Sequence, residues 1–405
     1  ANDLGSSGFD VYYGYGRVNA RRAVEQAPPD HDVCLLSVKM SSYVKLGNVA
    51  TINTTILNLG KSDESAITVQ FLVNNSLVDS QIVDFLASGS HASVRNLWTP
   101  TIQGVYNVTP YILPLMGETN VDNNAFFTLV SVRIPQVIRV PHDYAKIQDA
   151  VDAASERDTI YVASGTYYEN VWINKEDLTL AGADRSNTII DGNQTYDVIF
   201  VTVDNVRISN FTIRNSGISP YYYPLVSGIL LYYSQGDAIS NLTILGNYMG
   251  IGLFCSGGIT LRDINMISNV YNFGVEGYSL SDYIHDVDNS NTVDGKPVVY
   301  FVNEHNKEVP SDAGYVALVN STNIIVEDLN LTKNFESILF AYTSNCTMMN
   351  VFASASYVGA YLTHSSVALV QNNVIVNNSE GIYLNHARDN KVSNNTVMNN
   401  QDGIN

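Results

Sequence analysis

The chain is poor in cysteine and lacks any long apolar run. Its 405 residues include three cysteines, and no two of them form a Cys-x-x-Cys pair, so neither a zinc knuckle nor a redox motif is supported. We expect Cys34, Cys255 and Cys346 to be small buried residues without a disulfide bond. No apolar run reaches the roughly 18 residues that a transmembrane helix needs. The sequence therefore predicts no transmembrane segment.

Positive charge is also scarce. Lys and Arg number 21 against 39 Asp and Glu, and the formal net charge is -18. Such a chain repels phosphate backbones, which argues against nucleic acid as a partner. Apolar residues make up 45% of the sequence, enough for packed domains, and the length indicates two or more of them. Abundant Asn, Ser, Thr and Tyr are typical of β-rich secreted proteins, so we expect an extracellular or cell-surface location.

Residues 1–27 contain one short helical signal. Asn19 can cap a helix that ends before Pro28-Pro29. Residues 10–24 resemble the last helix of subtilisin-like (S8) serine peptidase domains. The resemblance implies that residues 1–27 are the C-terminal remnant of a truncated α/β domain, whose catalytic residues would lie upstream. Because the segment holds no triad, we expect no peptidase activity from this chain.

Residues 30–133 alternate short β-branched runs with turns, which predicts an antiparallel β-sandwich. The segment is similar to the CARDB domain, an immunoglobulin-like, adhesion-related module. The similarity is carried by Gly47-Asn48, Asn58-x-Gly60, Trp98, Gly104-x-Tyr106 and Asp122-Asn123-Asn124. It implies a spacer or adhesion role, and we expect Trp98 to anchor the core.

Residues 137–405 carry an internal repeat. Leu230, Gly252 and Gly274 are 22 residues apart, as are Phe340, Leu362 and Leu384. A period in the low twenties predicts a solenoid, and Asn-rich turns between β-branched strands favour a parallel β-helix over leucine-rich repeats. An amphipathic helix over 145–155 should cover its first turn. The predicted fold class is all-β: a right-handed parallel β-helix, preceded by an immunoglobulin-like β-sandwich and a short helical tail.

This region resembles the NosD-like, pectate-lyase-type β-helix family. The resemblance is carried by His285–Asp288, Asn291–Tyr300 and Asp312–Asn320, which interrupt the repeat. We expect a projecting hairpin there, with its turn near residues 304–307, and a β-helix that is C-terminally truncated at residue 405. Copper is implied by the family name alone. Its usual ligand types, at Met348, Met349, His364 and His386, form no convincing cluster in sequence.

The same interruption holds the densest set of ionisable residues. The candidate catalytic residues are His285, Asp286, Asp288, Lys296 and Asp312, with His285 as a base and Asp286 as its orienting acid. The Asp286-x-Asp288 spacing suggests calcium as the one possible metal ion, although the Gly and Glu of an EF-hand loop are missing. The alternative, which the usual polarity of loops favours, is that these residues cap turns and solvate the hairpin.

A tyrosine-rich loop is the second break in the repeat. Tyr221, Tyr222 and Tyr223 are candidates for carbohydrate binding, because a tyrosine ring can stack on a sugar face. Packing of the loop against the solenoid wall is the alternative.

The leading functional hypothesis is a non-catalytic extracellular module for carbohydrate binding or adhesion, attached to an upstream subtilisin-like peptidase. The expected partner is a polysaccharide or a cell-surface glycan. The alternatives are a polysaccharide-active lyase, hydrolase or epimerase, and a scaffold for a partner protein. No complete active site is recognisable in the sequence. Two carboxylates that converge in a groove would favour an enzyme, and dispersed charges would favour binding.

Overall fold

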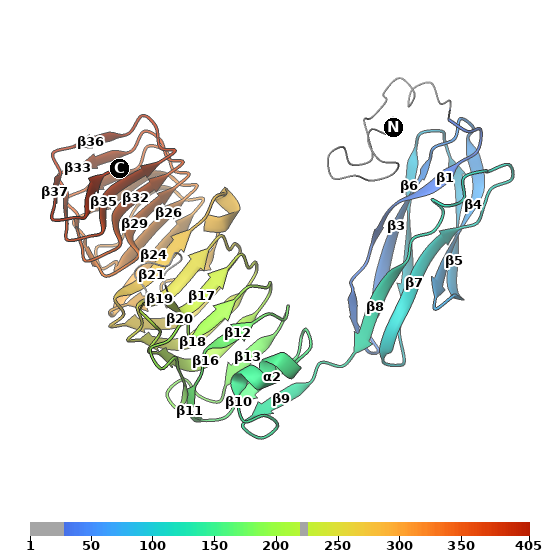
Figure 1. The fold of residues 1–405 in the computed structure, drawn as a ribbon. Helices are drawn as coiled ribbons and strands as arrows, with labels where there is room; N and C mark the ends of the chain where they lie inside the picture. The colour runs from blue at the N-terminus through green and yellow to red at the C-terminus, as the bar shows by residue number, and fades with distance from the viewer. Residues whose placement is uncertain (1–27, 219–225) are drawn as a thin grey trace, which may run out of the picture. The chain divides into compact units, whose positions relative to one another are not determined.

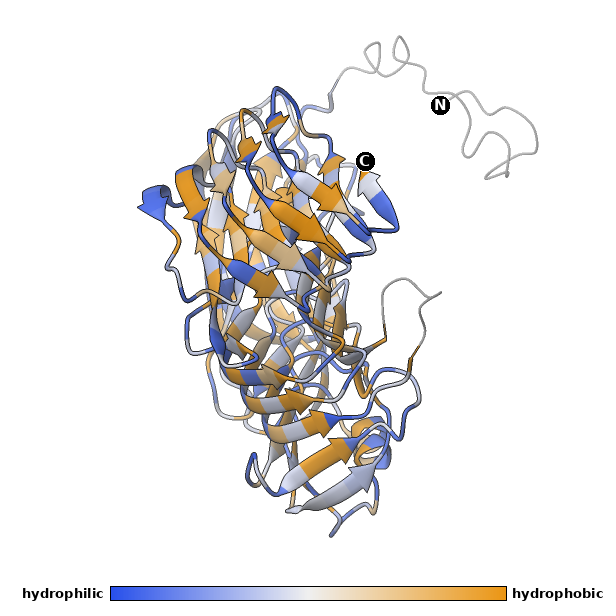
Figure 2. Ribbon diagram, turned by 90° about the vertical axis from the view of Figure 1, so that its left-hand side faces the viewer, coloured by the Kyte–Doolittle hydropathy of each residue, from blue (hydrophilic) through white to orange (hydrophobic). Residues whose placement is uncertain are grey.

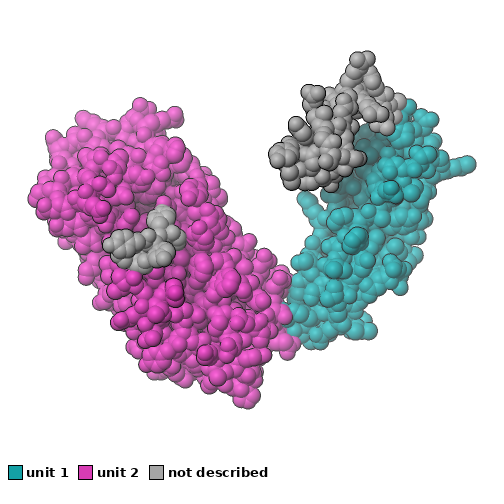
Figure 3. All heavy atoms as spheres, in the orientation of Figure 1, with its two compact units in different colours: residues 1–134 teal, residues 135–405 magenta. Residues whose placement is uncertain are grey.

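The computed structural model describes residues 28–218 and 226–405, and it divides into two compact units at residues 134 and 135 (Figure 3). Residues 1–27, which carry the subtilisin resemblance, lie outside the described residues. The protein is all-β, with 55% of residues in strands and 3% in helices. Within the described ranges, no helix is long and apolar enough to cross a membrane.

The first unit is a two-sheet β-sandwich. Its strands are β1 (Val33–Lys39), β2 (Tyr43–Lys45), β3 (Ala50–Asn58), β4 (Glu64–Val73), β5 (Ser76–Leu86), β6 (His91–Trp98), β7 (Gly104–Ile112) and β8 (Thr128–Arg133). One sheet has the order β1-β3-β6 and the other the order β2-β8-β7-β4-β5. All pairs are antiparallel except β2 with β8, which is parallel. The expected antiparallel sandwich is thus present, with one parallel strand at its edge.

Trp98 anchors the core of the sandwich, as predicted. Its side chain is buried and meets the Tyr106 ring edge-on, with 5.1 Å between ring centroids. It packs in a cluster with Ile52, Phe71 and Val108, which point inward from alternate positions of their strands.

The second unit is a parallel β-solenoid of about 12 turns (Figure 1). It begins with β9 (Val137–Val140) and helix α2 (Ile147–Ala153), whose buried residues are Ile147, Ala150 and Val151. The Glu169 carboxylate accepts hydrogen bonds from the backbone N–H groups of Ile147 and Gln148, at 2.9 and 3.0 Å. A carboxylate from the solenoid therefore caps the helix and holds it over the first turn, as the amphipathic pattern predicts.

The N-terminal part of the solenoid, the N-terminal stack, runs from β9 to β23. Its further strands are β10 (Thr159–Val162), β11 (Gly165–Tyr168), β12 (Val171–Ile173), β13 (Thr179–Gly182), β14 (Thr188–Asp191), β15 (Ile199–Val201), β16 (Arg207–Arg214), β17 (Ser227–Tyr232), β18 (Ala238–Leu245), β19 (Met249–Phe254), β20 (Thr260–Ile267), β21 (Tyr271–Glu276), β22 (Asp286–Val287) and β23 (Thr292–Val293), with a 3-10 helix η1 (Leu280–Tyr283). One of its sheets has the order β12-β15-β17-β19-β21.

The C-terminal part, the C-terminal stack, has three sheets. Its strands are β24 (Lys296–Val302), β25 (His305–Glu308), β26 (Tyr315–Val319), β27 (Thr322–Glu327), β28 (Asn330–Thr332), β29 (Glu336–Ala341), β30 (Thr347–Met349), β31 (Phe352–Ser354), β32 (Val358–Thr363), β33 (Leu369–Gln371), β34 (Val374–Val376), β35 (Glu380–Asn385), β36 (Lys391–Ser393), β37 (Thr396–Met398) and β38 (Asp402–Ile404). The first has the order β24-β26-β29-β32-β35-β38 and continues through the β23–β24 pair into the large sheet of the N-terminal stack. The other two have the orders β25-β27-β30-β33-β36 and β28-β31-β34-β37.

A hairpin joins the two stacks, but its turn differs from the predicted one. Strands β23 and β24 pair antiparallel around Asp294-Gly295, where both residues have positive φ, 47° and 83°. An Asp-Gly pair readily adopts this conformation, which suits a two-residue hairpin turn. The sequence suggested the turn near residues 304–307, but most of that segment belongs to β25, which pairs in parallel with β27.

The 22-residue register of the solenoid is confirmed. Leu230, Gly252 and Gly274 occupy equivalent positions, and so do Phe340, Leu362 and Leu384. The Leu362 side chain is fully buried in the C-terminal core, also as predicted. Figure 2 shows the consequence for hydropathy: the stacked strands are largely hydrophobic and the connecting turns largely hydrophilic.

Asparagine marks the corners of the stacks. Two pairs of asparagines lie one turn apart. The side-chain amide of Asn373 donates a hydrogen bond to Asn395 at 2.9 Å, and that of Asn378 donates one to Asn400 at 3.1 Å. Such ladders satisfy buried polar groups at each corner. These asparagines therefore stack along the axis of the solenoid.

Candidate functional site

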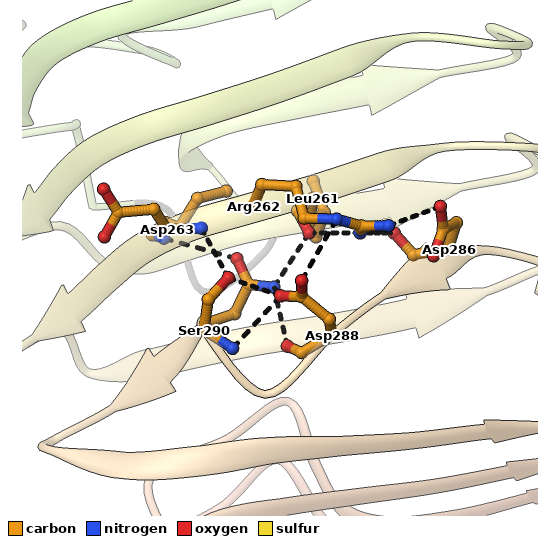
Figure 4. Close-up of polar contacts among 8 residues, drawn as sticks. Leu261, Arg262, Asp263, Asp286, Asp288 and Ser290 are labelled. Atoms are coloured by element: carbon orange, nitrogen blue, oxygen red, sulfur yellow. Dashed lines mark hydrogen bonds and ion pairs between the residues drawn. The ribbon is translucent and has the colours of Figure 1, made fainter.

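Two predicted catalytic residues, Asp286 and Asp288, bind a single arginine on the N-terminal stack (Figure 4). Arg262 contacts Asp286 through Nη2 at 2.5 Å and Asp288 through Nε at 3.1 Å. Ser290 Oγ also donates a hydrogen bond to Asp288. The guanidinium thus supplies the positive charge that a calcium ion would otherwise provide.

The side chain of His285 lies inside the solenoid and is 5% exposed. Its Nδ1 accepts a hydrogen bond from the Ile259 N–H at 3.4 Å, and its ring packs 5.7 Å from that of Tyr300. Burial lowers the pKa of His285 to about 3, so the imidazole is neutral at physiological pH. A buried ring cannot reach a polymer on the surface, and Asp286 binds Arg262 rather than this ring.

Lys296 and Asp312 are both exposed. Lys296 Nζ donates a hydrogen bond to the backbone oxygen of Asn330 at 3.0 Å, and Asp312 lies in a turn. The five candidates therefore divide among an ion pair, the core and two separate surface positions. Tyr221, Tyr222 and Tyr223 lie outside the described residues.

The three cysteines are free, as expected. Cys34 and Cys346 are buried, whereas Cys255 is only half-buried, which differs from the prediction for this residue. Cys255 lines a small surface cavity, described below, and this explains its partial exposure.

A different group of residues forms a cavity where the two stacks meet. The cavity has a volume of about 210 Å³. The cavity is lined by five apolar or aromatic residues and two glutamates. These are Phe335, Tyr357, Val358, Tyr361 and Tyr383, with Glu276 and Glu380. Glu276 ends β21 of the N-terminal stack, and the other residues belong to β29, β32 and β35 of the C-terminal stack or directly precede them. We call this the Glu276–Glu380 cavity.

Two aromatic ladders create its walls. Phe335 and Tyr357 are stacked, with 4.9 Å between ring centroids and 5° between planes. Tyr361 and Tyr383 are also stacked, at 5.2 Å and 17°. Each pair is 22 residues apart, so the solenoid period places the second ring over the first.

Both carboxyl groups of the cavity have raised pKa values. Burial, together with the nearby charge of Glu380, raises the pKa of Glu276 to about 7. Burial also raises the pKa of Glu380, together with the charge of Asp402 on the next turn. The Glu380 Oε2 atom is buried and has no hydrogen-bond partner in the described part of the chain. Carboxyl groups with raised pKa values in a cavity are a recognised mark of a functional site.

A third carboxyl group, Glu336, lies behind the cavity and is fully buried. Its Oε1 accepts hydrogen bonds from the Val275 N–H at 2.9 Å and from the Tyr315 hydroxyl. Burial raises the pKa of Glu336 to about 8, and the charge of Glu276 adds to the effect. Glu336 therefore ties β21 to β29, next to the backbone hydrogen bond that Phe335 donates to Phe273.

Two further hollows lie on the solenoid. A smaller cavity of about 70 Å³ shares Glu276 with the first and is lined by aromatic residues that include Tyr232, Tyr233 and Phe254. A shallow polar groove of about 540 Å³ follows β25, β27 and β30. In that groove Asn306, Asn323 and Asn345 hydrogen-bond to one another, at 2.7 and 2.5 Å, so several of their amide groups are already engaged.

Sequence reasoning missed the Glu276–Glu380 cavity, although part of its signal was present. The repeat pairs Phe335 with Tyr357 and Tyr361 with Tyr383, but the period was used only to place interior residues. Glu276 belongs to the other stack, and no sequence spacing relates it to Glu380.

Comparisons with known proteins match each unit to a different family. Residues 285–405 match the family described as periplasmic copper-binding protein (NosD), and residues 32–127 match the CARDB family. The first unit is thus similar to the CARDB family over most of its described length. No curated protein matches the chain.

Solved structures resemble the two units separately. A domain of a putative cell surface protein from Methanosarcina acetivorans is 30% identical over 25% of this chain and 91% of that chain, with a TM-score of 0.23. A CARDB domain from Pyrococcus furiosus, in complex with di-metal ions, is 22% identical over 27% of this chain and 99% of that chain, with a TM-score of 0.25. An alginate lyase from Paenibacillus sp. is 13% identical over 66% of this chain and 97% of that chain, with a TM-score of 0.33.

The copper in the NosD description has no matching ligand set in this solenoid. Within the described residues, no group of three or more His, Cys, Asp or Glu could hold a metal ion. The rings of His364 and His386 stack at 4.8 Å, only 7° from parallel. Ring nitrogens bind a metal in the ring plane at about 2 Å, so two stacked imidazoles cannot converge on one ion. Their Nδ1 atoms also contact Thr363 Oγ1 and Asn385 Oδ1, at 3.1 and 2.7 Å.

Proposed function

We propose that the solenoid binds a polysaccharide or cell-surface glycan outside the cell through the Glu276–Glu380 cavity, without cleaving it. The observation that supports this most strongly is the cavity itself, in which two aromatic ladders and two carboxyl groups meet. Tyrosine rings offer apolar faces to the C–H faces of sugars, and carboxylate oxygens accept hydrogen bonds from hydroxyl groups.

The architecture supports a polymeric ligand. A solenoid presents a long regular surface, which suits a chain of repeated units. The Glu276–Glu380 cavity and the smaller cavity share Glu276, so adjacent hollows are available to neighbouring sugar residues. In this proposal the CARDB domain acts as an adhesion module or spacer, and the resemblance of residues 10–24 to a subtilisin-like domain supports an upstream peptidase.

A glycan array tests the proposal. The complete chain is applied with and without calcium, and binding is compared with that of Tyr383→Ala. Because Tyr383 supplies one ring of the cavity, its loss should weaken binding by about tenfold, in the range measured for truncated aromatic contacts. Tyr168→Ala is the matched control, since Tyr168 is 67% exposed and lies outside the cavity. A triple alanine variant of Tyr221, Tyr222 and Tyr223 tests the loop independently. Binding that Tyr383→Ala leaves intact would contradict the assignment.

The second candidate function is glycoside hydrolysis, because two carboxyl groups with raised pKa values face one cavity. A protonated carboxyl can act as the acid and an ionised one as the base or nucleophile. New reducing ends on incubation with a bound glycan, lost in Glu276→Gln and in Glu380→Gln, would favour the enzyme. Glycan binding without new reducing ends would favour a non-catalytic binding module. If no glycan binds, the scaffold hypothesis is the one that stands.

A further inference from the structure

The Glu276–Glu380 cavity combines aromatic walls with negative charge and lacks any fixed cation. In the described part of the chain, none of the residues that line it is Lys, Arg or His. Three other carboxyl groups of this solenoid do have a cation beside them. Asp286 and Asp288 share Arg262, and Asp191 binds Arg214 at 2.7 Å.

One carboxyl group of the cavity, that of Glu380, is also incompletely satisfied. Glu380 Oε2 is buried without a hydrogen-bond partner among the described residues, and Glu276 and Glu380 lie close enough for their charges to repel. Leaving a buried carboxylate unpaired is costly, and a positive charge placed between the two groups would remove most of that cost.

The aromatic rings favour the same kind of ligand. A tyrosine face carries negative electrostatic potential and attracts an organic cation placed over it within about 6 Å. Four aromatic side chains line the cavity together with two carboxyl groups, so an ammonium group bound there would lie near aromatic rings and a carboxylate at once. Small inorganic cations prefer oxygen ligands in larger numbers than two carboxyl groups supply.

We propose that this cavity binds an organic ammonium group, and that in the bound glycan this group is the free amine of an amino sugar. The assignment to an amino sugar rests on the proposed function, whereas the ammonium site does not. A uronic acid polymer would be repelled by Glu276 and Glu380. A neutral sugar would leave both carboxyl groups without a counter-charge.

Calorimetric titration of the complete chain at pH 7 tests the proposal. The pKa of Glu276 is about 7, so part of this carboxyl group is ionised there. The amines of glucosamine still carry part of their positive charge at this pH and largely lose it at higher pH. The probes are a glucosamine hexamer, its fully N-acetylated form, a galacturonic acid hexamer and tetramethylammonium chloride. N-acetylation removes the positive charge and keeps the sugar ring. Tetramethylammonium keeps the charge and removes the sugar. Sodium chloride at the same concentration controls for ionic strength.

We expect the glucosamine hexamer to bind at least about tenfold more tightly than its N-acetylated form, since a hydrogen bond between charged partners is worth more than one between neutral groups. Glu276→Gln and Glu380→Gln should each remove most of this preference. Glu156→Gln is the matched control, because Glu156 is exposed and lies in the turn after α2. Thermal unfolding of each variant shows that the fold is retained, and Tyr383→Leu tests the aromatic wall without altering charge.

The outcomes separate the two proposals. Tetramethylammonium binding that depends on Glu276, without binding of any sugar, supports the ammonium site and refutes the glycan function. Equal binding of the two hexamers, unaffected by Glu276→Gln, refutes the ammonium site and leaves the glycan function standing. If none of the four probes binds, the ammonium site is refuted.

Discussion

Replacing Leu362 by aspartate places a charge inside the C-terminal stack. Leu362 is fully buried and is stacked in register between Phe340 and Leu384. Loss of a buried leucine side chain alone costs about 2–5 kcal/mol. An unpaired charge adds several kcal/mol more. The sum approaches or exceeds the roughly 5–15 kcal/mol that stabilises a typical domain.

The damage should remain largely in the C-terminal turns, because each solenoid turn contacts mainly its neighbours. We expect circular dichroism to show a lowered melting temperature, and hydrogen exchange to show lost protection from about β29 onward. The new carboxyl group should have a folded-state pKa above its unfolded value of about 3.9. Its charge therefore destabilises the fold above that folded-state pKa. The penalty should shrink as the pH falls toward 4.

Val374→Asp provides the control for this variant. Val374 begins β34, is 37% exposed and precedes Ile375, which is fully buried. The same substitution there should cost within about 0.5 kcal/mol, as is usual for surface positions. An equal fall in melting temperature in Leu362→Asp and Val374→Asp would show that the register is wrong. An unchanged melting curve for Leu362→Asp would show the same.

Three further predictions concern other parts of the chain. Burial raises the pKa of Glu336 to about 8. The contribution of this group to stability should therefore be present below about pH 4.5 and be lost as the pH rises toward 8. Glu336→Gln should flatten the decline of the melting temperature over this range. If the melting temperature falls equally steeply with pH in the wild type and in Glu336→Gln, this prediction is refuted. Calcium should change the wild-type melting temperature little, because Arg262 already forms ion pairs with both Asp286 and Asp288. A large calcium-dependent shift that Asp288→Asn removes would contradict this. The purified chain should not hydrolyse casein, and turnover blocked by a serine-protease inhibitor would disprove that expectation.

Much of the fold follows from local patterns. Alternating strands and turns predict the sandwich, and inward-facing positions such as Ile52 and Trp98 do form its core. The 22-residue period predicts the solenoid, because identical turns can stack only when inward positions recur at a fixed interval. Asparagine at the corners agrees with this pattern, since its backbone accepts the left-handed conformation that a sharp corner needs.

The hairpin shows where a readable local signal was overlooked. Asp294-Gly295 is a strong two-residue turn pair, and it lies between short β-forming segments. The polar run at 304–307 was favoured instead, because polarity alone suggests a turn. In the structure those residues form an exposed strand at the end of a sheet, where polar side chains face water.

The candidate site depended on tertiary structure. His285 and Asp286 are adjacent in sequence, yet one is buried and the other binds an arginine on the surface, because successive residues of an extended chain point in opposite directions. Glu276 and Glu380 are far apart in sequence, and they share a cavity because the hairpin at Asp294-Gly295 joins one stack to the next. The sequence by itself determined the period, and hence which residues stack within each part of the solenoid. Only the three-dimensional join between the parts decided which carboxyl groups meet, since that depends on how one stack is placed against the other and not on any spacing along the chain.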